Sequence, residues 1–251
     1  MQTIVLATHK GGSGKSTLAI GLALAAIQAG HIVRLIETDS QGTLSNWQTR
    51  RVFADPTVEP VYTAGEIEPK LQSLDRSGIT MTIIDTASGI SAVTTAAIQY
   101  ADLCLIPARP CVADIEATAS TLSIVRAWKK PFAFVLNQTP IRGQRLSGAA
   151  ATLGEEAPLD VSDVLAQPFI VMRNDHQDAL GAGLSVIEYA PTSKSADEIR
   201  SLWQWVAARL PSMAAETKPV LDLLETPPFA VFLHEQLQSP ELASQSWRRS
   251  D

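Results

Sequence analysis

The feature that most constrains the fold is a glycine-rich segment, residues 10–17, which separates two apolar runs of different periodicity. Before it, residues 3–7 form a short apolar run rich in β-branched side chains, which favours a buried parallel strand. After it, residues 18–29 place alanine, leucine and isoleucine at helical spacing, and Gly30 follows in the position typical of a helix end. A strand, a glycine loop and a helix in this order predict the first unit of a parallel α/β sheet.

The same alternation of short apolar runs and helical patterns continues along most of the chain. The predicted strands are Ile32–Ile36, Thr80–Ile84, Asp102–Ile106 and Phe132–Leu136, and the predicted helices are Ser45–Gln48, Glu66–Leu74, Ile115–Trp128 and Ser193–Leu210. Residues 53–65 contain two prolines and are predicted to be irregular. This order, with the glycine-rich loop after the first strand, predicts an α/β fold with a parallel, doubly wound sheet flanked by helices, as in a P-loop NTPase. Residues 1–211 are expected to form this domain, and residues 212–251 a C-terminal extension that is partly helical or disordered.

The composition excludes several classes of protein. Apolar residues make up 45% of the 251, enough for a full core, and the net charge of −6 argues against a chain coated in basic residues. Only Cys104 and Cys111 are present, which gives neither a disulfide framework nor a recognisable metal-binding spacing. The sequence shows no secretory signal and no membrane-spanning run, and no DNA-reading domain is expected before the first strand. We therefore expect a cytoplasmic protein.

The glycine-rich segment has the chemistry of a phosphate-binding loop. Its glycines let the backbone wrap around an anion, and the helix that follows presents unpaired N–H groups to it. Lys15 is placed to reach the β- and γ-phosphates, the Ser16 hydroxyl to ligate Mg²⁺, and Thr17 to contact the α-phosphate. The expected ligands are therefore ATP and Mg²⁺, and a turn that merely connects strand and helix is the alternative. The expected binding residues are Lys10, Gly11, Gly12, Ser13, Gly14, Lys15, Ser16 and Thr17.

One departure from the usual phosphate loop is informative. The standard pattern has a glycine where this chain has His9, and a second lysine, Lys10, stands beside it. The segment resembles the deviant Walker A motif of the ParA/MinD superfamily. In that family the extra lysine reaches across a dimer interface to the partner's phosphates, so the resemblance implies a homodimer that forms on ATP binding. Such a lysine would act as an arginine finger does. The alternative for Lys10 is a solvated surface lysine.

Two acidic segments extend the resemblance. Residues 37–41, Glu-Thr-Asp-Ser-Gln, match the family's Asp-x-Asp-Pro-Gln segment with two departures, and the resemblance assigns Asp39 to orienting the attacking water. Asp85 ends a predicted strand that matches the Walker B strand, whose acid holds Mg²⁺ through water. For either acid alone, a cap or turn residue is the alternative. The expected catalytic residues are Lys10, Lys15 and Asp39, and the expected metal-site residues are Ser16, Asp39 and Asp85.

Contacts to adenine are expected later in the chain. Asn137 ends a strand where the family often has an asparagine that reads the base, because an amide can donate and accept at once. An Asx turn is the alternative for this residue. Residues 167–170 resemble the family segment whose backbone closes over the base, which adds Pro168 and Phe169 to the expected nucleotide contacts. The resemblance covers roughly residues 1–210.

Among the branches of the superfamily, the resemblance favours a small ParA-type protein. The two cysteines do not match the cluster ligands of nitrogenase-type iron proteins, and the acidic residues of segment 212–251 argue against the basic membrane helix of MinD-type members. The implied function is an ATPase of weak intrinsic activity that positions or partitions a plasmid, a chromosome or another cargo. A ParB-like or cargo-adaptor partner would stimulate hydrolysis. The alternatives are a P-loop enzyme that transfers phosphate to a small substrate, a MinD-like positioning ATPase, and a nucleotide-dependent scaffold.

The resemblance also implies that the ATP-bound dimer binds duplex DNA without sequence specificity and is then associated with the nucleoid. Such binding would be electrostatic and salt-sensitive. No aromatic platform is interleaved with the basic residues, which favours contact with the duplex backbone over stacking on a single strand. Ordinary solvated side chains are the alternative for each candidate. The candidate contacts are Arg142, Arg145, Arg173, Lys194, Arg200 and Arg209.

Overall fold

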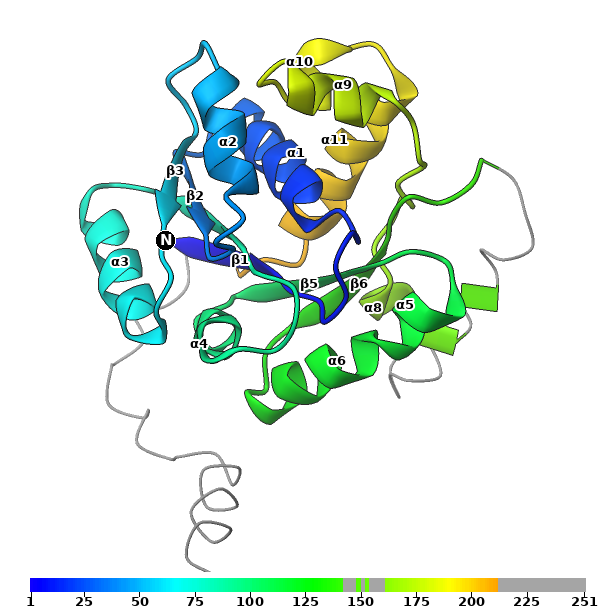
Figure 1. Ribbon diagram of the computed structural model, residues 1–251, viewed down its shortest axis with the longest axis horizontal. Coiled ribbons are helices and arrows are strands. Elements are labelled where there is room, and N and C mark those ends of the chain that lie inside the picture. The colour runs from blue at the N-terminus through cyan, green and yellow to red at the C-terminus, as the bar shows by residue number, and fades with distance from the viewer. Residues whose placement is uncertain (142–147, 150–151, 154–160, 212–251) are drawn as a thin grey trace, which may run out of the picture. The chain divides into compact units, whose positions relative to one another are not determined.

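The computed structural model describes residues 1–141, 148–149, 152–153 and 161–211, and in that part of the chain it contains a six-stranded sheet. Every strand pair is parallel, and the strand order is β3-β2-β4-β1-β5-β6 (Figure 1). The strands are β1 (Gln2–Leu6), β2 (Val33–Glu37), β3 (Thr57–Pro60), β4 (Met81–Asp85), β5 (Leu103–Ala108) and β6 (Phe132–Leu136). The predicted α/β fold with a parallel sheet is confirmed.

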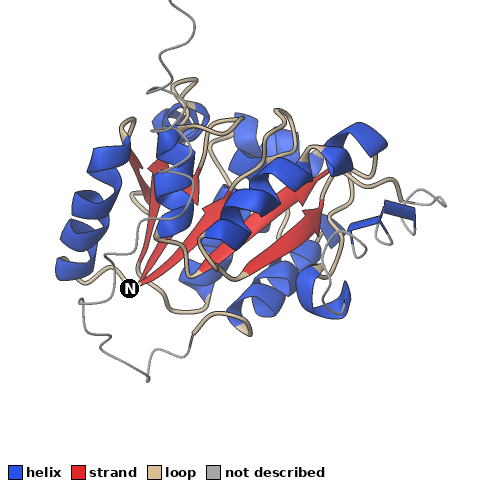
Figure 2. Cartoon of the chain, turned by 90° about the horizontal axis from the view of Figure 1, so that it is seen from below, coloured by secondary structure: helices blue, strands red, loops and turns tan. Residues whose placement is uncertain are grey.

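Helices cover both faces of the sheet (Figure 2). One layer holds α1 (Lys15–Gln28), α2 (Thr43–Arg50), α9 (Asp175–Gly181), α10 (Val186–Tyr189) and α11 (Lys194–Ala207). The other layer holds α3 (Ala64–Arg76), α4 (Ala92–Gln99), α5 (Val112–Glu116), α6 (Thr118–Ala127) and α8 (Val161–Val164). In the described part of the chain, no helix combines the length and apolar character needed to cross a bilayer.

The strands β1, β4, β5 and β6 are mostly apolar because both of their faces are buried. In β1, Ile4 and Leu6 pack into the layer that contains α1, whereas Val5 packs into the opposite layer with α4 and α6. None of the three side chains is exposed. A strand buried on both sides cannot alternate apolar and polar residues, which is why these segments read as continuous apolar runs.

The structure differs from the sequence-based expectation in several elements. The segment predicted to be irregular contains β3, an edge strand that pairs only with β2 and ends at Pro60. The single helix predicted over residues 115–128 is two helices, α5 and α6, that meet at Ala117. Helices α4, α8, α9 and α10 were not predicted from the sequence. Residues 212–251 lie outside the described part, so the predicted domain boundary at residue 211 stays a prediction.

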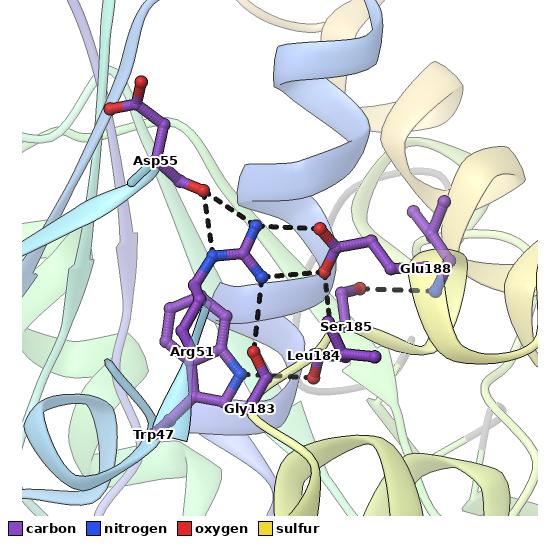
Figure 3. A network of polar contacts seen from close by, with 8 residues as sticks. Trp47, Arg51, Asp55, Gly183, Leu184, Ser185 and Glu188 are labelled. Atoms are coloured by element: carbon purple, nitrogen blue, oxygen red, sulfur yellow. Dashed lines mark hydrogen bonds and ion pairs between the residues drawn. The ribbon is translucent and has the colours of Figure 1, made fainter. Parts of the chain in front are cut away.

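The C-terminal end of helix α2 is bonded to α10 and to the segment before it (Figure 3). The Arg51 guanidinium donates to both carboxylate oxygens of Glu188, at 2.9 and 2.7 Å, and to the Asp55 carbonyl oxygen. The Trp47 indole N–H donates to the Leu184 carbonyl oxygen at 3.1 Å, and the Arg51 guanidinium lies 4.9 Å from the centre of the Trp47 ring. Only 2% of the Arg51 side chain is exposed, so this ion pair is largely shielded from water.

Gly183 makes this close approach possible. Its φ is +71°, and a Cβ atom at this position would lie 2.5 Å from the carbonyl carbon and oxygen of Arg50. We expect Gly183→Ala to lower the free energy of unfolding by more than roughly 2 kcal/mol, because a left-handed conformation and a steric clash both act against the new methyl group.

Gly78→Ala is the matched control, because Gly78 has φ +80° but no atom lies within 4 Å of the added Cβ. Only the conformational penalty of about 1–2 kcal/mol applies there. Urea unfolding midpoints of the two variants measure the difference, and equal losses would show that the clash at Gly183 is relieved without cost.

Candidate nucleotide and magnesium site

The phosphate loop lies between β1 and α1, at the carboxyl edge of the sheet. Gly12 and Gly14 have φ of 77° and 85°, in the left-handed region, and Gly14 is the N-cap of α1. The first turn of α1 therefore directs its unpaired N–H groups and the positive end of its dipole into the loop. The Ser13 hydroxyl is buried and has no hydrogen-bond partner among the described residues. This cradle fits an anion of the size of a phosphate.

The two residues that follow β6 hold the loop from outside. The Asn137 side-chain amide donates to the Ser13 carbonyl oxygen at 2.8 Å, and the Gln138 amide donates to the Gly12 carbonyl oxygen at 3.0 Å. A Cβ atom at Gly14 would lie 2.3 Å from the Asn137 amide nitrogen, so this position needs glycine for close approach as well as for its φ. Carbonyl groups engaged in this way cannot turn toward a bound anion.

The predicted acids converge on the same loop. Asp85 is the last residue of β4, with Leu6 opposite it on β1 and Glu37 opposite it on β2. Its side chain is 1% exposed, and neither carboxylate oxygen has a hydrogen-bond partner among the described residues. Burial raises the pKa of Asp85 to about 7, against the opposing effects of the nearby Ser16 hydroxyl and the Lys15 ammonium.

Lys15 faces these acids. Burial lowers the pKa of its ammonium, while the charges of Asp85 and Asp39 raise it. Its Nζ donates to the Ser88 hydroxyl at 3.3 Å, within the segment that follows β4. Four of the predicted residues, Lys15, Ser16, Asp39 and Asp85, are therefore gathered at one edge of the sheet, although they come from three different segments of the chain.

The two acids at the end of β2 and just after it, Glu37 and Asp39, make different contacts. Asp39 is half-buried, and its carboxylate accepts a hydrogen bond from the Gln41 N–H at 2.9 Å. Glu37, which stands where the family pattern has an aspartate, is fully buried and accepts from the N–H groups of Leu44 and Ser45 at 2.6 and 3.1 Å. The Ser45 hydroxyl also donates to it. Glu37 thus caps the N-terminus of α2, where a carboxylate is favoured.

A small cavity of about 110 Å³ opens beside the loop, on the side expected to hold the base. It is lined by Gly14, Thr17, Leu18, Asn137, Gln138, Ile170, Val171, Met172, Arg173, His176 and Gln177. Pro168 and Phe169 do not line it, whereas the residues directly after them do. Asn137 does line it, but its amide oxygen already accepts from the Gln138 N–H at 2.9 Å. The contact of Asn137 with adenine, and those of Pro168 and Phe169 with the nucleotide, stay predictions.

Lys10 has a partner that the sequence analysis missed. Its Nζ lies 3.3 Å from a carboxylate oxygen of Asp114, which is in α5, and the Lys10 side chain is 38% exposed. No motif marked Asp114 in the sequence, because its contact with Lys10 depends on the adjacency of β1 and β5.

The candidate DNA contacts are scattered. Arg142 and Arg145 lie outside the described residues. Arg173 makes a bidentate ion pair with Glu198 at 2.7 and 2.8 Å and lines the base-side cavity. Arg200 donates to the Pro191 carbonyl oxygen and to Asp197 at 2.9 and 3.1 Å, and Arg209 lies over the Trp205 ring at 3.4 Å. Lys194, at the start of α11, is exposed. A role in DNA binding stays a prediction for all six.

The fold and the phosphate loop define a P-loop nucleotide-binding protein, and comparison with known proteins refines this class. A sequence profile described as VirC1 protein matches residues 1–153. The protein virC1 of Rhizobium radiobacter is 30% identical over 131 residues, a match that covers 50% of this chain and 56% of that protein. The maintenance of carboxysome distribution protein A of Halothiobacillus neapolitanus is 27% identical over 208 residues, covering 80% of this chain and 94% of that protein.

A solved structure shows the same fold. The septum site-determining protein MinD of Pyrococcus horikoshii, complexed with Mg-ADP, superposes with a TM-score of 0.64 over 82% of this chain and 95% of that one, at 16% identity. The chain belongs to the VirC1 protein family, within the ParA/MinD superfamily of P-loop ATPases.

The residues present fit a nucleotide with its Mg²⁺. The left-handed glycines and the start of α1 supply a cradle for phosphates, and the Ser13 hydroxyl is buried there without a partner. The two unpartnered oxygens of Asp85 and the adjacent Ser16 hydroxyl are hard oxygen ligands of the kind that Mg²⁺ or its bound waters prefer.

The raised pKa of Asp85 predicts how the stability of the ligand-free protein varies with pH. Between about pH 4 and pH 7 the folded protein keeps the Asp85 proton while the unfolded chain has lost it, so stability falls as the pH rises through this window. For Asp85 alone the slope is at most about 1.4 kcal/mol per pH unit. We expect Asp85→Asn to remove this contribution, so that the variant gains stability over the wild type from pH 5 to pH 8.

Denaturant unfolding without nucleotide or Mg²⁺, at several pH values, measures this effect. Asp178→Asn, on the exposed face of α9, is the control for the loss of a carboxylate. Parallel pH profiles for the wild type and Asp85→Asn would contradict the prediction.

Proposed function

We propose that this protein is an ATP-switched positioning ATPase. ATP closes a homodimer, the dimer binds duplex DNA without sequence specificity, and hydrolysis stimulated by an adaptor protein resets it to the monomer. The observation that carries the proposal is Lys10, a second lysine of the phosphate loop that is partly exposed and lies outside the cradle formed by Gly12, Gly14 and Lys15. A cation held there is available to the phosphates of a second protomer.

Within one protomer, the proposed roles follow from charge and position. The N–H groups at the start of α1 bind phosphate oxygens, and Lys15 neutralises the β- and γ-phosphates. Asp39 accepts a hydrogen bond from the attacking water, since its half-buried carboxylate is at the edge of the same site. Lys10 of the second protomer stabilises the negative charge on the transferring phosphoryl group. Intrinsic hydrolysis is weak because this last charge is absent from the monomer.

Ser16 and Asp85 would hold Mg²⁺, directly or through water, and the ion would supply positive charge to the phosphates. Lys15 lowers the cost of keeping Asp85 ionised in this buried position, because an opposite charge favours the ionised carboxylate. Asn137 and Gln138 keep the loop carbonyls turned away from the phosphates through their bonds to Ser13 and Gly12. The base is expected in the cavity that Asn137 lines.

The cargo and the DNA step are inferred from the family. Two of the relatives are named virC1 and maintenance of carboxysome distribution protein A, and the structural neighbour MinD is named as a septum site-determining protein. We infer a cargo adaptor as the stimulating partner, and the nucleoid as the place where the ATP-bound dimer resides in the cytoplasm. Lys194, at the start of α11, is the exposed candidate DNA contact among the described residues, and Arg200, in the same helix, is partly exposed.

The function predicts that Lys10→Ala abolishes ATP-dependent dimerisation and reduces stimulated hydrolysis. The loss in turnover should approach the range measured for arginine fingers, on the order of 10³, while nucleotide binding to the monomer is retained. Light scattering with ATP and with ADP gives the mass, and phosphate release gives the turnover. Lys70→Ala is the control for the loss of charge, because it removes a lysine of α3 that is paired with Glu59 of β3.

A DNA shift assay tests the switch. Wild-type protein should bind duplex with ATP and not with ADP, and the affinity should fall as salt rises from 50 to about 200 mM. Equal dimerisation by wild type and Lys10→Ala, or DNA binding that ignores the nucleotide, would overturn the proposal. Turnover that requires a small acceptor molecule and not DNA would favour a phosphotransferase.

A further inference from the structure

One buried carboxylate holds two cations beside the phosphate loop. Asp114 is 2% exposed, and Lys10 Nζ lies 3.3 Å from its Oδ1. Arg109 donates to both of its oxygens, from Nε to Oδ2 at 2.5 Å and from Nη2 to Oδ1 at 3.2 Å. The Cys111 thiol adds a third donor, to Oδ2 at 3.0 Å. Burial alone would raise the pKa of Asp114, but hydrogen bonds from Arg109, Cys111 and Lys10 lower it below its ordinary value.

The two cations differ in how they are attached. Arg109 directly follows β5, and the Cys111 N–H donates to its carbonyl oxygen at 2.8 Å, while the Asp114 N–H donates to the Cys111 carbonyl oxygen at 3.1 Å. Arg109, just after β5, and Asp114, in the first turn of α5, are therefore joined by one short stretch of backbone. Lys10 comes from a different segment, the loop after β1. The arginine stays with the carboxylate whatever the phosphate loop does, whereas the lysine is free to leave.

Departure of Lys10 would be costly if it were the sole partner of Asp114. A buried carboxylate that loses its last cation bears a desolvation penalty of several kcal/mol. A bidentate arginine on the same carboxylate removes most of that penalty, since the guanidinium fork satisfies both oxygens at once. Among the described residues, Lys10 in contrast makes one ion-pair contact with Asp114 and is partly exposed. The free-energy cost of breaking that contact is therefore smaller.

We propose that Arg109 is a positioning residue for Lys10: it neutralises Asp114 and so lets the Lys10 side chain turn from Asp114 to the phosphates bound by a second copy. Asp114 holds Lys10 back in the monomer, and Arg109 weakens this hold. The inference rests on the proposed function, because it concerns how easily Lys10 is released into the dimer. It assigns opposite effects to two residues that contact each other.

Two substitutions separate the effects. Among the described residues, Arg109→Gln leaves Lys10 as the only cation on Asp114, so Lys10 is held more tightly and the dissociation constant of the ATP dimer rises by about tenfold. Asp114→Asn removes the charge that attracts Lys10 and lowers that constant. In the Asp114→Asn background, Arg109→Gln has no further effect, because the carboxylate through which it acts is gone. If Arg109 only supported the fold, Arg109→Gln would weaken dimerisation equally in the wild-type and the Asp114→Asn backgrounds.

The hold on Lys10 is measured directly in the nucleotide-free monomer. Acetic anhydride labels exposed amines, and mass spectrometry of the peptide that contains Lys10 gives its labelling rate relative to Lys70. The rate should fall severalfold in Arg109→Gln and rise in Asp114→Asn. Arg109→Lys keeps the charge without the fork and should lie between the wild type and Arg109→Gln. Arg76→Gln, on exposed α3, controls for a lost arginine.

The dimer constants are then measured by light scattering with ATP, and the unfolding midpoint of each variant establishes that it is folded. Unchanged or faster labelling of Lys10 in Arg109→Gln would overturn the inference, as would an equal effect of Arg109→Gln with and without Asp114. Failure of the proposed function gives a different pattern. In that case Lys10→Ala leaves dimerisation unchanged while the labelling rates still shift as described.

Discussion

The site depends on the place of β1 at the centre of the sheet, hydrogen-bonded to β4 on one side and to β5 on the other. Because the three strands are parallel, their carboxyl ends meet at one edge. The phosphate loop continues from β1, Asp85 ends β4, and the segment with Arg109 and Asp114 follows β5. Backbone pairing thus brings together a phosphate cradle, a buried acid and a carboxylate that binds Lys10, none of which is adjacent in sequence.

The sequence predicted the fold and the gathering of Lys15, Asp39 and Asp85, because apolar runs and loop glycines are local patterns with known spacing. It did not predict β3, since Pro56 and Pro60 resemble loop residues and only pairing with β2 makes the segment a strand. Asp114 escaped notice for a similar reason: its partner Lys10 is more than a hundred residues away in the sequence. Contacts between strands, unlike periodicity, leave no local signal.

Asn137 and Glu37 show a subtler limit. Each belongs to a segment that the sequence marked, and the structure shows a hydrogen-bonding role that the sequence did not indicate. Asn137 supports the carbonyl of Ser13, and Glu37 caps α2 through Leu44 and Ser45. A side chain's type indicates what it can bond, but the nearest unsatisfied group decides what it does bond. The identity of a motif residue therefore predicts its neighbourhood better than its partner.

Helix α2 has only eight residues, a length at which an isolated helix is marginal in water. Its N-terminus is tied by Glu37 to the end of β2, and just beyond its C-terminus Arg51 is tied to Glu188. A short helix fixed at both ends cannot absorb a displacement by fraying. A shift of the turn that carries Asp39 would therefore move α2 as a rigid body and be transmitted to α10 through Arg51 and Glu188.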